Sequence, residues 1–136
     1  MEIGQWVAVY VASLAAFLAI DLVWLGKIAR GFYRRQLADL MLEKLKWQPA
    51  LGFYLLYVFG LLVLVVAPAV EAGSALKAGG LGALLGCVSY ATYDLSNLAT
   101  LKKWPGAVVA ADIVWGSLLT GAVSLISYAA ARAVAG

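Results

Sequence analysis

The chain has 136 residues, of which 65% are hydrophobic and 12% are charged, and its mean hydropathy is +0.94. This composition excludes an ordinary soluble domain of this length and predicts a single transmembrane domain over residues 1–136. The net charge is only +3 and histidine is absent, so proton chemistry would depend on Asp, Glu, Tyr or Lys.

The first predicted element is an apolar run over residues 5–25, about the 20 residues needed to cross a bilayer. Glu2 precedes this run and basic residues follow it, the reverse of a cleaved signal peptide, so we expect the segment to be retained. Residues 27–47 mix basic residues with apolar residues at helical spacing. They predict an amphipathic helix at the interface, against anionic lipid headgroups. The alternative is a solvated connector that only sets topology.

Three further apolar runs predict spans at residues 50–69, 79–101 and 107–128. Pro49 is suited to the first turn of the second span. Gly82 and Gly86 in the third span form a small-xxx-small pair that would let a neighbouring helix approach closely. The predicted fold class is therefore all-α and membrane-embedded, a four-transmembrane-helix bundle with an interfacial helix between spans 1 and 2.

Basic residues predict the orientation, because short loops rich in Lys and Arg stay in the cytoplasm. The first and third connections hold eight of them, and the opposite side holds only Lys77 and Arg132. We therefore expect a multi-pass protein with both termini outside and with residues 27–47 and the KKWPG turn inside. Since topology accounts for most of the positive charge, no nucleic-acid partner is expected.

Three carboxylates interrupt the predicted spans, namely Asp21, Asp94 and Asp112. At about 1.5 Å per residue they lie roughly 6 to 10 Å from the inner ends of their helices, so they reach a similar depth. A carboxylate inside a span is costly and usually functional. We predict a proton, cation or ligand site that also includes polar and aromatic neighbours at helical spacing: Trp24, Tyr90, Tyr93, Asn97 and Trp115.

The first and fourth spans share a short motif. AIDLVW contains Asp21 and Trp24, AADIVW contains Asp112 and Trp115, and four of the six residues are identical. Because these spans are expected to cross in opposite directions, the match resembles a local inverted repeat. Coincidence in a chain rich in alanine and valine is the alternative.

Three crowded carboxylates in a partly dry site cannot all stay ionised, so we expect at least one to hold a proton near neutral pH. Asp21, Asp94, Asp112 and Asn97 could also give a hard cation an all-oxygen shell. No dedicated metal site or cofactor is predicted, because histidine is absent and Cys87 is the single cysteine. No known catalytic motif is present, so the sequence neither assigns nor excludes an enzymatic activity.

Three stretches, YATYDLSNLATLKKWP, ADIVWG and DLVWLGKIARGFYRRQL, resemble a family of small bacterial four-helix inner-membrane proteins classed as a domain of unknown function. Its core reads Y-D-L-[ST]-N-L-A-T, and the resemblance covers nearly the whole chain. Asp21, Asp94, Asn97 and Asp112 match positions by which the family is recognised. The resemblance implies an inner-membrane location and a single-domain fold, and it implies no activity.

Three functions remain open on the sequence. The leading hypothesis is a proton- or cation-coupled transporter or channel, expected as a homodimer because four short helices enclose little volume. The second is a membrane enzyme or binding protein for a lipid or isoprenoid, with the carboxylates facing a lateral cleft. The third is a structural membrane partner whose polar cluster only specifies helix packing. A water-filled path across the membrane would favour the transporter, and an apolar groove open to lipid would favour the lipid-directed protein. A dry cluster in which every polar group is paired would favour the structural partner.

Overall fold

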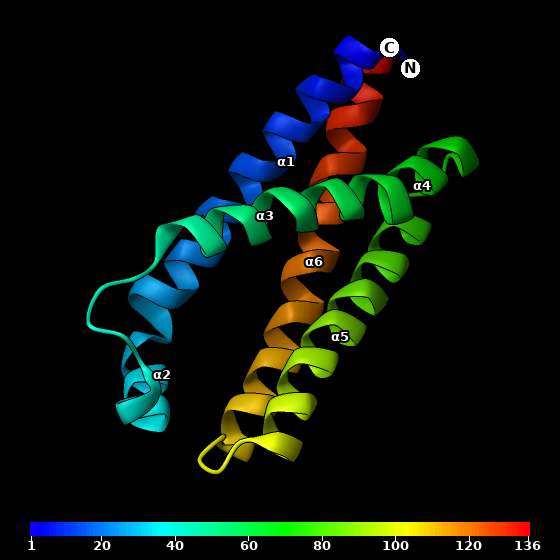
Figure 1. The fold of residues 1–136 in the computed structure, drawn as a ribbon. Helices are drawn as coiled ribbons and strands as arrows, with labels where there is room; N and C mark the ends of the chain where they lie inside the picture. Colours follow the sequence, from blue (N-terminus) through cyan, green and yellow to red (C-terminus); the bar gives the residue numbers. More distant parts are fainter.

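The computed structural model describes all 136 residues as helices joined by short connections (Figure 1). The helices in chain order are α1 (Ile3–Val23), the π-helical turn η1 (Trp24–Ile28), α2 (Arg30–Leu37) and the 3-10 turn η2 (Ala38–Leu40). They are followed by α3 (Trp47–Leu61), the π-helical turn η3 (Leu62–Val66), α4 (Ala67–Ala72), α5 (Ala75–Thr100) and α6 (Gly106–Ala135).

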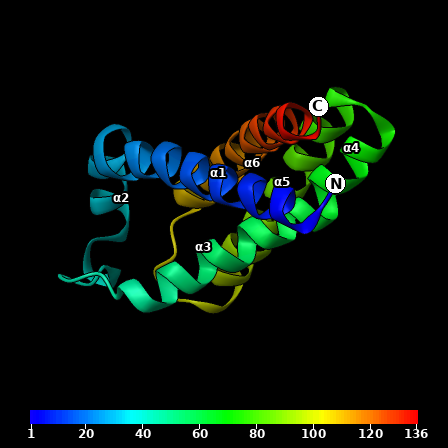
Figure 2. The same cartoon turned by 90° about the horizontal axis from the view of Figure 1, so that it is seen from above.

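The long helices alternate in direction, so that the two termini lie together at one end and α2 lies at the other (Figure 1). The α5–α6 turn shares the end with α2, where Lys103 of the turn and Asp39 of η2 form an exposed ion pair at 3.7 Å. Seen from above, α2 and the start of α3 stand apart at that end, whereas the helices converge toward α4 (Figure 2). The helix backbones are therefore most widely separated at the α2 end.

Three helical stretches are long and apolar enough to cross a membrane: Ile3–Ile28, Trp47–Ala72 and Gly106–Ala135. They correspond to the first, second and fourth predicted spans. α5, which contains the third predicted span, also has 26 residues, but four glycines, Lys77, Asp94 and several amide and hydroxyl side chains lower its hydropathy. By length and composition the helices thus include three membrane spans, and the fourth is a long helix packed against them.

Glycine allows α5 and α6 to lie in close contact. Gly82 and Gly86 are buried against α6, and a Cβ atom on Gly86 would collide with the backbone carbonyl of Gly116. On α6, the ring of Tyr90 from α5 packs against Gly116, in the space that a Cβ atom on Gly116 would occupy. This small-residue contact matches the expected role of the Gly82 and Gly86 pair.

An apolar core fills the half of the bundle nearer the termini. Its nine buried residues come from α1, α3, η3 and α6, and Phe17 is its largest side chain: Val9, Phe17, Val58, Leu61, Leu62, Val66, Leu119, Val123 and Ala131. The hydroxyls of Ser13 and Ser127 pair there at 2.6 Å, which satisfies two polar groups between α1 and α6. These side chains join α1, α3, η3 and α6 in one apolar cluster.

The predicted interfacial helix is shorter than residues 27–47. Residues 24–28 belong to the π-helical end of the first helix, α2 ends at Leu37, and Ala38 adopts a positive φ of 20°. Tyr33 of α2 is buried, but residues 38–46 are all exposed. A short helix needs tertiary packing to be stable, and this segment has none, so the apolar spacing beyond Leu37 does not form a helix.

Candidate functional site

A cavity of about 780 Å³ lies at the α2 end of the bundle, and we call it the chamber. Five helical regions, α1 with η1, α2, α3, α5 and α6, contribute to its wall, and 12 of its 16 lining residues are hydrophobic. Its charged residues are Asp21 and Asp112, and its aromatic residues are Tyr33, Phe53, Tyr54, Tyr57, Tyr90, Tyr93, Trp104 and Trp115. The chamber is therefore an aromatic enclosure with two carboxylates.

Asp21, near the end of α1, has one hydrogen-bond donor for each oxygen. The hydroxyl of Tyr54 on α3 donates to Oδ2 at 2.6 Å, and the indole of Trp115 on α6 donates to Oδ1 at 3.1 Å. The side chain is 5% exposed. Donors from two other helices thus hold a buried carboxylate in a fixed orientation, which offsets part of the free energy needed to bury it.

Asp112 receives its hydrogen bond from outside the spans. The hydroxyl of Tyr33 on α2 donates to Asp112 Oδ1, and the indole of Trp24 donates to the Tyr33 oxygen at 3.3 Å. Burial of Tyr33, followed by the hydrogen bond to Asp112, raises the pKa of the Tyr33 hydroxyl above its usual value. The hydroxyl therefore remains protonated and able to donate, and α2 is tied to the chamber.

The AIDLVW and AADIVW motifs meet at the chamber. Trp24 and Trp115 stack with ring centroids 4.4 Å apart and planes at 9°. Each indole also bonds toward the aspartate of the other motif, Trp115 directly to Asp21 and Trp24 through Tyr33 to Asp112. The shared Asp and Trp of the two segments thus form one reciprocal network between α1 and α6.

Asp94 lies behind the chamber wall and is fully buried. The indole of Trp104 donates to its Oδ1 at 3.1 Å, whereas Oδ2 has no hydrogen-bond donor and the carboxyl adjoins that of Asp112. Two adjacent carboxyls, one fully buried and one half-buried, repel each other if both are ionised, but a single proton between them supplies the missing donor. Asp94 and Asp112 are therefore arranged to share one proton.

The structure distributes the predicted site residues unevenly. Tyr90 and Tyr93 line the chamber, and Tyr93 packs edge-on against Trp104 at 5.7 Å. Asn97 is partly buried and does not line it. No three acidic or cysteine side chains gather as a metal site, so Asp21, Asp94 and Asp112 do not meet as one cluster. Asp21 belongs to one hydrogen-bonded group, and Asp94 and Asp112 belong to another.

Sequence reasoning undervalues four residues of this site. Tyr33 falls within the predicted interfacial helix, Tyr54 and Tyr57 fall within the second predicted span, and Trp104 falls in the connection after the third. The structure places all four in the chamber wall. One sequence signal is available for Tyr33, which follows Asp21 by twelve residues. If the chain turns back after the first helix, Tyr33 can return to the depth of Asp21, but hydrophobic periodicity does not predict such a turn.

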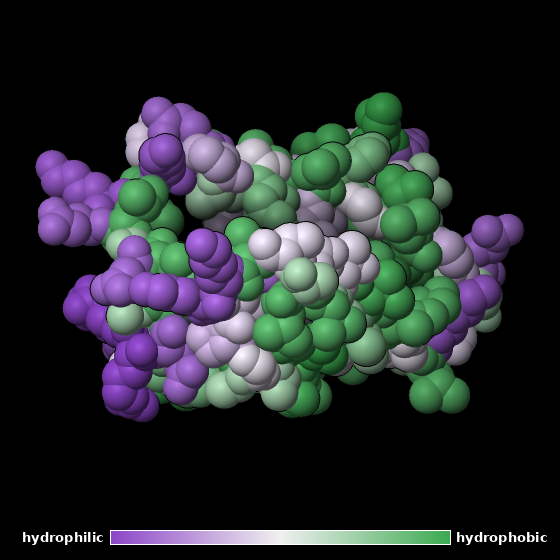
Figure 3. All heavy atoms as spheres, turned by 60° about the horizontal axis from the view of Figure 1, so that its bottom comes forward, coloured by the Kyte–Doolittle hydropathy of each residue, from purple (hydrophilic) through white to green (hydrophobic).

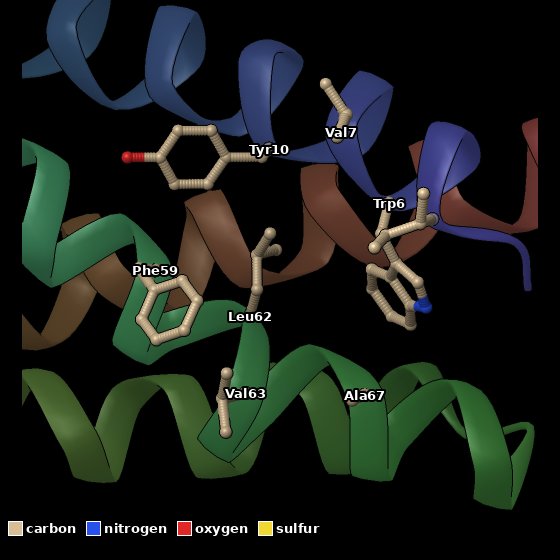
Figure 4. A pocket seen from close by; sticks show the side chains of 8 residues that line it. Trp6, Val7, Tyr10, Phe59, Leu62, Val63 and Ala67 are labelled. Carbon is tan, nitrogen blue, oxygen red and sulfur yellow. The ribbon is translucent and has the colours of Figure 1, made fainter.

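A second cavity of about 500 Å³ lies between α1 and the α3 to α4 segment (Figure 4). Figure 4 shows Trp6, Phe59 and Leu62 directed into the space between the two ribbons. All eight lining residues are hydrophobic, and the Tyr10 hydroxyl already donates to the backbone oxygen of Leu55 at 2.8 Å. This cavity has no charged group, so we do not place chemistry there.

Comparison with known protein families identifies the chain. A family model described as "Predicted membrane protein (DUF2177)" matches residues 6–129. The chain belongs to the DUF2177 family. The expected resemblance to a membrane family of unknown function is thus confirmed at the family level. No curated protein and no solved structure matches the chain, so the geometry of the chamber carries the functional argument for this DUF2177 member.

The shared proton leads to a spectroscopic prediction. In the infrared spectrum of the purified protein we expect a band from a protonated carboxyl above pH ~5, where an ordinary Asp with a pKa of about 3.9 is already ionised. The band should shift or disappear in Asp94→Asn, because only one carboxyl of the pair then remains. The Asp39→Asn variant is the matched control, since Asp39 is exposed. A wild-type spectrum without the band would contradict the shared proton.

Proposed function

We propose that this protein is a small membrane carrier that binds a cation in the chamber and couples its binding to release of the proton held by Asp94 and Asp112. The charge of the chamber carries the proposal. Two carboxylates line it, no Lys or Arg lines it, and all ten basic residues of the chain are exposed. An acidic cavity without a neutralising base attracts cations.

Coupling follows from the position of the proton. A cation beside Asp112 favours the ionised form of the pair, so it promotes proton release, and a bound proton weakens cation binding by the same factor. Other titratable groups near enough to feel the charge of the pair are Tyr33 from α2 and Tyr90 and Tyr93 from α5. None of them is a base, so the two carboxyls are the groups suited to exchange a proton for a cation.

The apolar core beyond the chamber supports a carrier over a continuous channel. The opposite half of the bundle contains the apolar core around Phe17, whose side chain is fully buried. A carrier exposes its site to one side of the membrane at a time, so in any single conformation the other side is closed. The transport step would require the helices around that core to separate.

The orientation belongs to the same proposal. We infer that α5 crosses the membrane alongside α6, since the two helices are closely packed over their length and have comparable lengths. Hydrophilic side chains gather over α2 and its connection on one side of Figure 3, while hydrophobic side chains cover much of the rest. Eight of the ten basic residues lie in the two connections at this end. We therefore place the mouth of the chamber in the cytoplasm and both termini in the periplasm of a bacterial inner membrane.

The topology can be tested by labelling single cysteines with an impermeant thiol reagent after Cys87→Ser. A cysteine at position 103, in place of Lys103, is expected to react only in inverted vesicles, and one in place of Gly73 only in intact cells. Both positions are exposed, so accessibility in the folded protein does not limit the reaction. Labelling of both positions from the same side would remove α5 as a span, and the reverse pattern would invert the orientation.

A lipid-directed binding protein is the second candidate function. Its supporting observation is the apolar character of the chamber, with 12 hydrophobic residues among the 16 that line it. Such a protein would bind its ligand without moving protons across the bilayer. Proton flux therefore separates the two candidates.

The carrier function can be tested in proteoliposomes that contain a pH-sensitive dye and have an acidic lumen. A panel of Na⁺, K⁺, Mg²⁺ and quaternary ammonium salts is added outside, with an ionophore present to hold the membrane potential at zero. We expect at least one cation to cause alkalinisation of the lumen, because its entry drives proton exit. Asp112→Asn should abolish this flux and Asp39→Asn should preserve it. Absence of flux with every cation in the panel would refute the carrier proposal.

A further inference from the structure

We propose that the cation bound in the chamber is an organic ammonium ion with an apolar body, and that neither an alkali nor an alkaline-earth metal ion is its ligand. This inference rests on the proposed function, because it names the substrate class of the same site. Three features of the chamber support it: its aromatic walls, the way its carboxylates are already bonded, and its size.

The walls provide the first reason. Eight aromatic side chains line the chamber, and they come from α2, α3, α5, α6 and the α5–α6 turn. Aromatic ring faces attract cations, and an enclosure of several rings is the usual way to recognise a quaternary ammonium group, which cannot donate hydrogen bonds. A metal ion instead requires several oxygen ligands around one point, and rings do not provide them.

The hydrogen bonds of the carboxylates provide the second reason. Both oxygens of Asp21 already accept bonds, from Tyr54 and Trp115, and Asp112 accepts one from Tyr33. No three acidic side chains converge. These carboxylates therefore contribute negative potential to the chamber without forming a coordination shell. Long-range attraction of this kind suits a bulky cation whose charge is shielded by carbon substituents.

A buried acceptor next to the wall strengthens this point. Asp94 is 0% exposed and its Oδ2 has no donor. Its two side-chain neighbours, Trp104 and Asp112, both line the chamber. One shared proton leaves the Asp94 and Asp112 pair with a single negative charge, which lies at one side of the aromatic enclosure.

Size and access provide the third reason. A volume of about 780 Å³ lies within the range of roughly 300–1,000 Å³ found for small organic ligands. An amphiphilic cation concentrates in the lipid interface through its apolar body, and it can therefore reach the chamber from the bilayer.

A matched pair of probes tests the charge requirement. Benzyltrimethylammonium and neopentylbenzene have nearly the same shape, but the second has carbon in place of the positive nitrogen. Calorimetric titration of the purified protein in a neutral detergent is expected to give at least tenfold tighter binding of the ammonium probe. Excess Na⁺, K⁺ or Mg²⁺ should not displace it beyond the general effect of ionic strength. Equal binding of the two probes, or displacement specific to one metal ion, would overturn the inference.

A matched pair of variants tests the location. Phe53 lines the chamber and makes no hydrogen bond, whereas Phe59, six residues along the same helix, lines the second cavity. Both side chains are about half exposed, at 47% and 58%, so Leu at either position should leave the fold intact. We expect Phe53→Leu to weaken benzyltrimethylammonium binding about fivefold, the effect of losing one cation–aromatic contact, and Phe59→Leu to leave it unchanged. Equal effects of the two variants would contradict the assigned site.

The outcomes distinguish this inference from the carrier proposal. If Na⁺ or K⁺ moves protons in proteoliposomes while benzyltrimethylammonium neither binds nor moves them, the carrier proposal stands and the organic ligand is refuted. If the ammonium probe binds with the expected dependence on Phe53 but no cation moves protons, the substrate class stands and transport is refuted. If no cation binds and none moves protons, both are refuted.

Discussion

Gly86→Ala is expected to destabilise the bundle severely, and Gly80→Ala on the same helix is expected to leave its stability unchanged or slightly higher. The Cβ atom added at Gly86 would collide with the backbone carbonyl of Gly116 and with the Thr120 hydroxyl. Backbone atoms cannot move aside as a flexible side chain can, so α5 and α6 must separate. Overpacking of a closely fitted contact costs about 1–3 kcal/mol, and loss of neighbouring contacts such as Gly82 against Ser124 adds to this cost.

Gly80 is the matched control because a Cβ atom there meets nothing within 4 Å. Alanine is also favoured over glycine in helices by up to about 1 kcal/mol. Thermal unfolding in detergent, followed by circular dichroism, measures both variants under the same conditions. Similar midpoints for the two variants would show that the α5–α6 contact is not under the steric constraint described above.

The same contact shows what the sequence could and could not predict about the fold. Apolar runs and their flanking charges located α1, α3 and α6 well, because membrane insertion depends on local hydropathy. The Gly82 and Gly86 pair indicated a close helix neighbour but did not say which helix, since spacing carries no information about the partner. α6 is that partner because it has Gly116, Thr120 and Ser124 at the matching level.

The candidate site was predictable only in part. Charge inside apolar spans identified Asp21, Asp94 and Asp112, and a shared motif connected the first and last of these. Trp115, which donates to Asp21, was among the predicted site residues. The donors Tyr33 and Trp104 escaped prediction, because they lie in connections whose path depends on tertiary packing. Residues 38–46 show the same effect in reverse, since their apolar spacing resembles a helix but no neighbour covers them. Local sequence patterns thus located the carboxylates inside the helices, whereas tertiary packing determined which side chains donate hydrogen bonds to them.

Asp94→Asn is expected to retain the fold and to remove the pH dependence of cation binding. The amide has nearly the same shape as the carboxyl, its oxygen can accept the bond from Trp104, and its N–H can donate permanently to Asp112. A donor that is always present replaces the shared proton, so nothing remains to be released when the cation binds. In the wild type, ammonium binding should weaken as pH falls, because protonation of the pair competes with the cation.

Asp94→Leu separates the two roles of this carboxyl. Leucine leaves the partly buried Trp104 indole without its acceptor, which costs about 1–3 kcal/mol of stability, whereas Asp94→Asn should cost much less. Calorimetric titration of benzyltrimethylammonium at several pH values, together with thermal unfolding of both variants, measures coupling and stability separately. If Asp94→Asn binds the probe with the same pH dependence as the wild type, the exchanged proton resides elsewhere. If both variants unfold at the same temperature and keep that dependence, Asp94 serves neither as an acceptor for Trp104 nor as the proton site, and the chamber binds its cation through Asp21 and Asp112 alone.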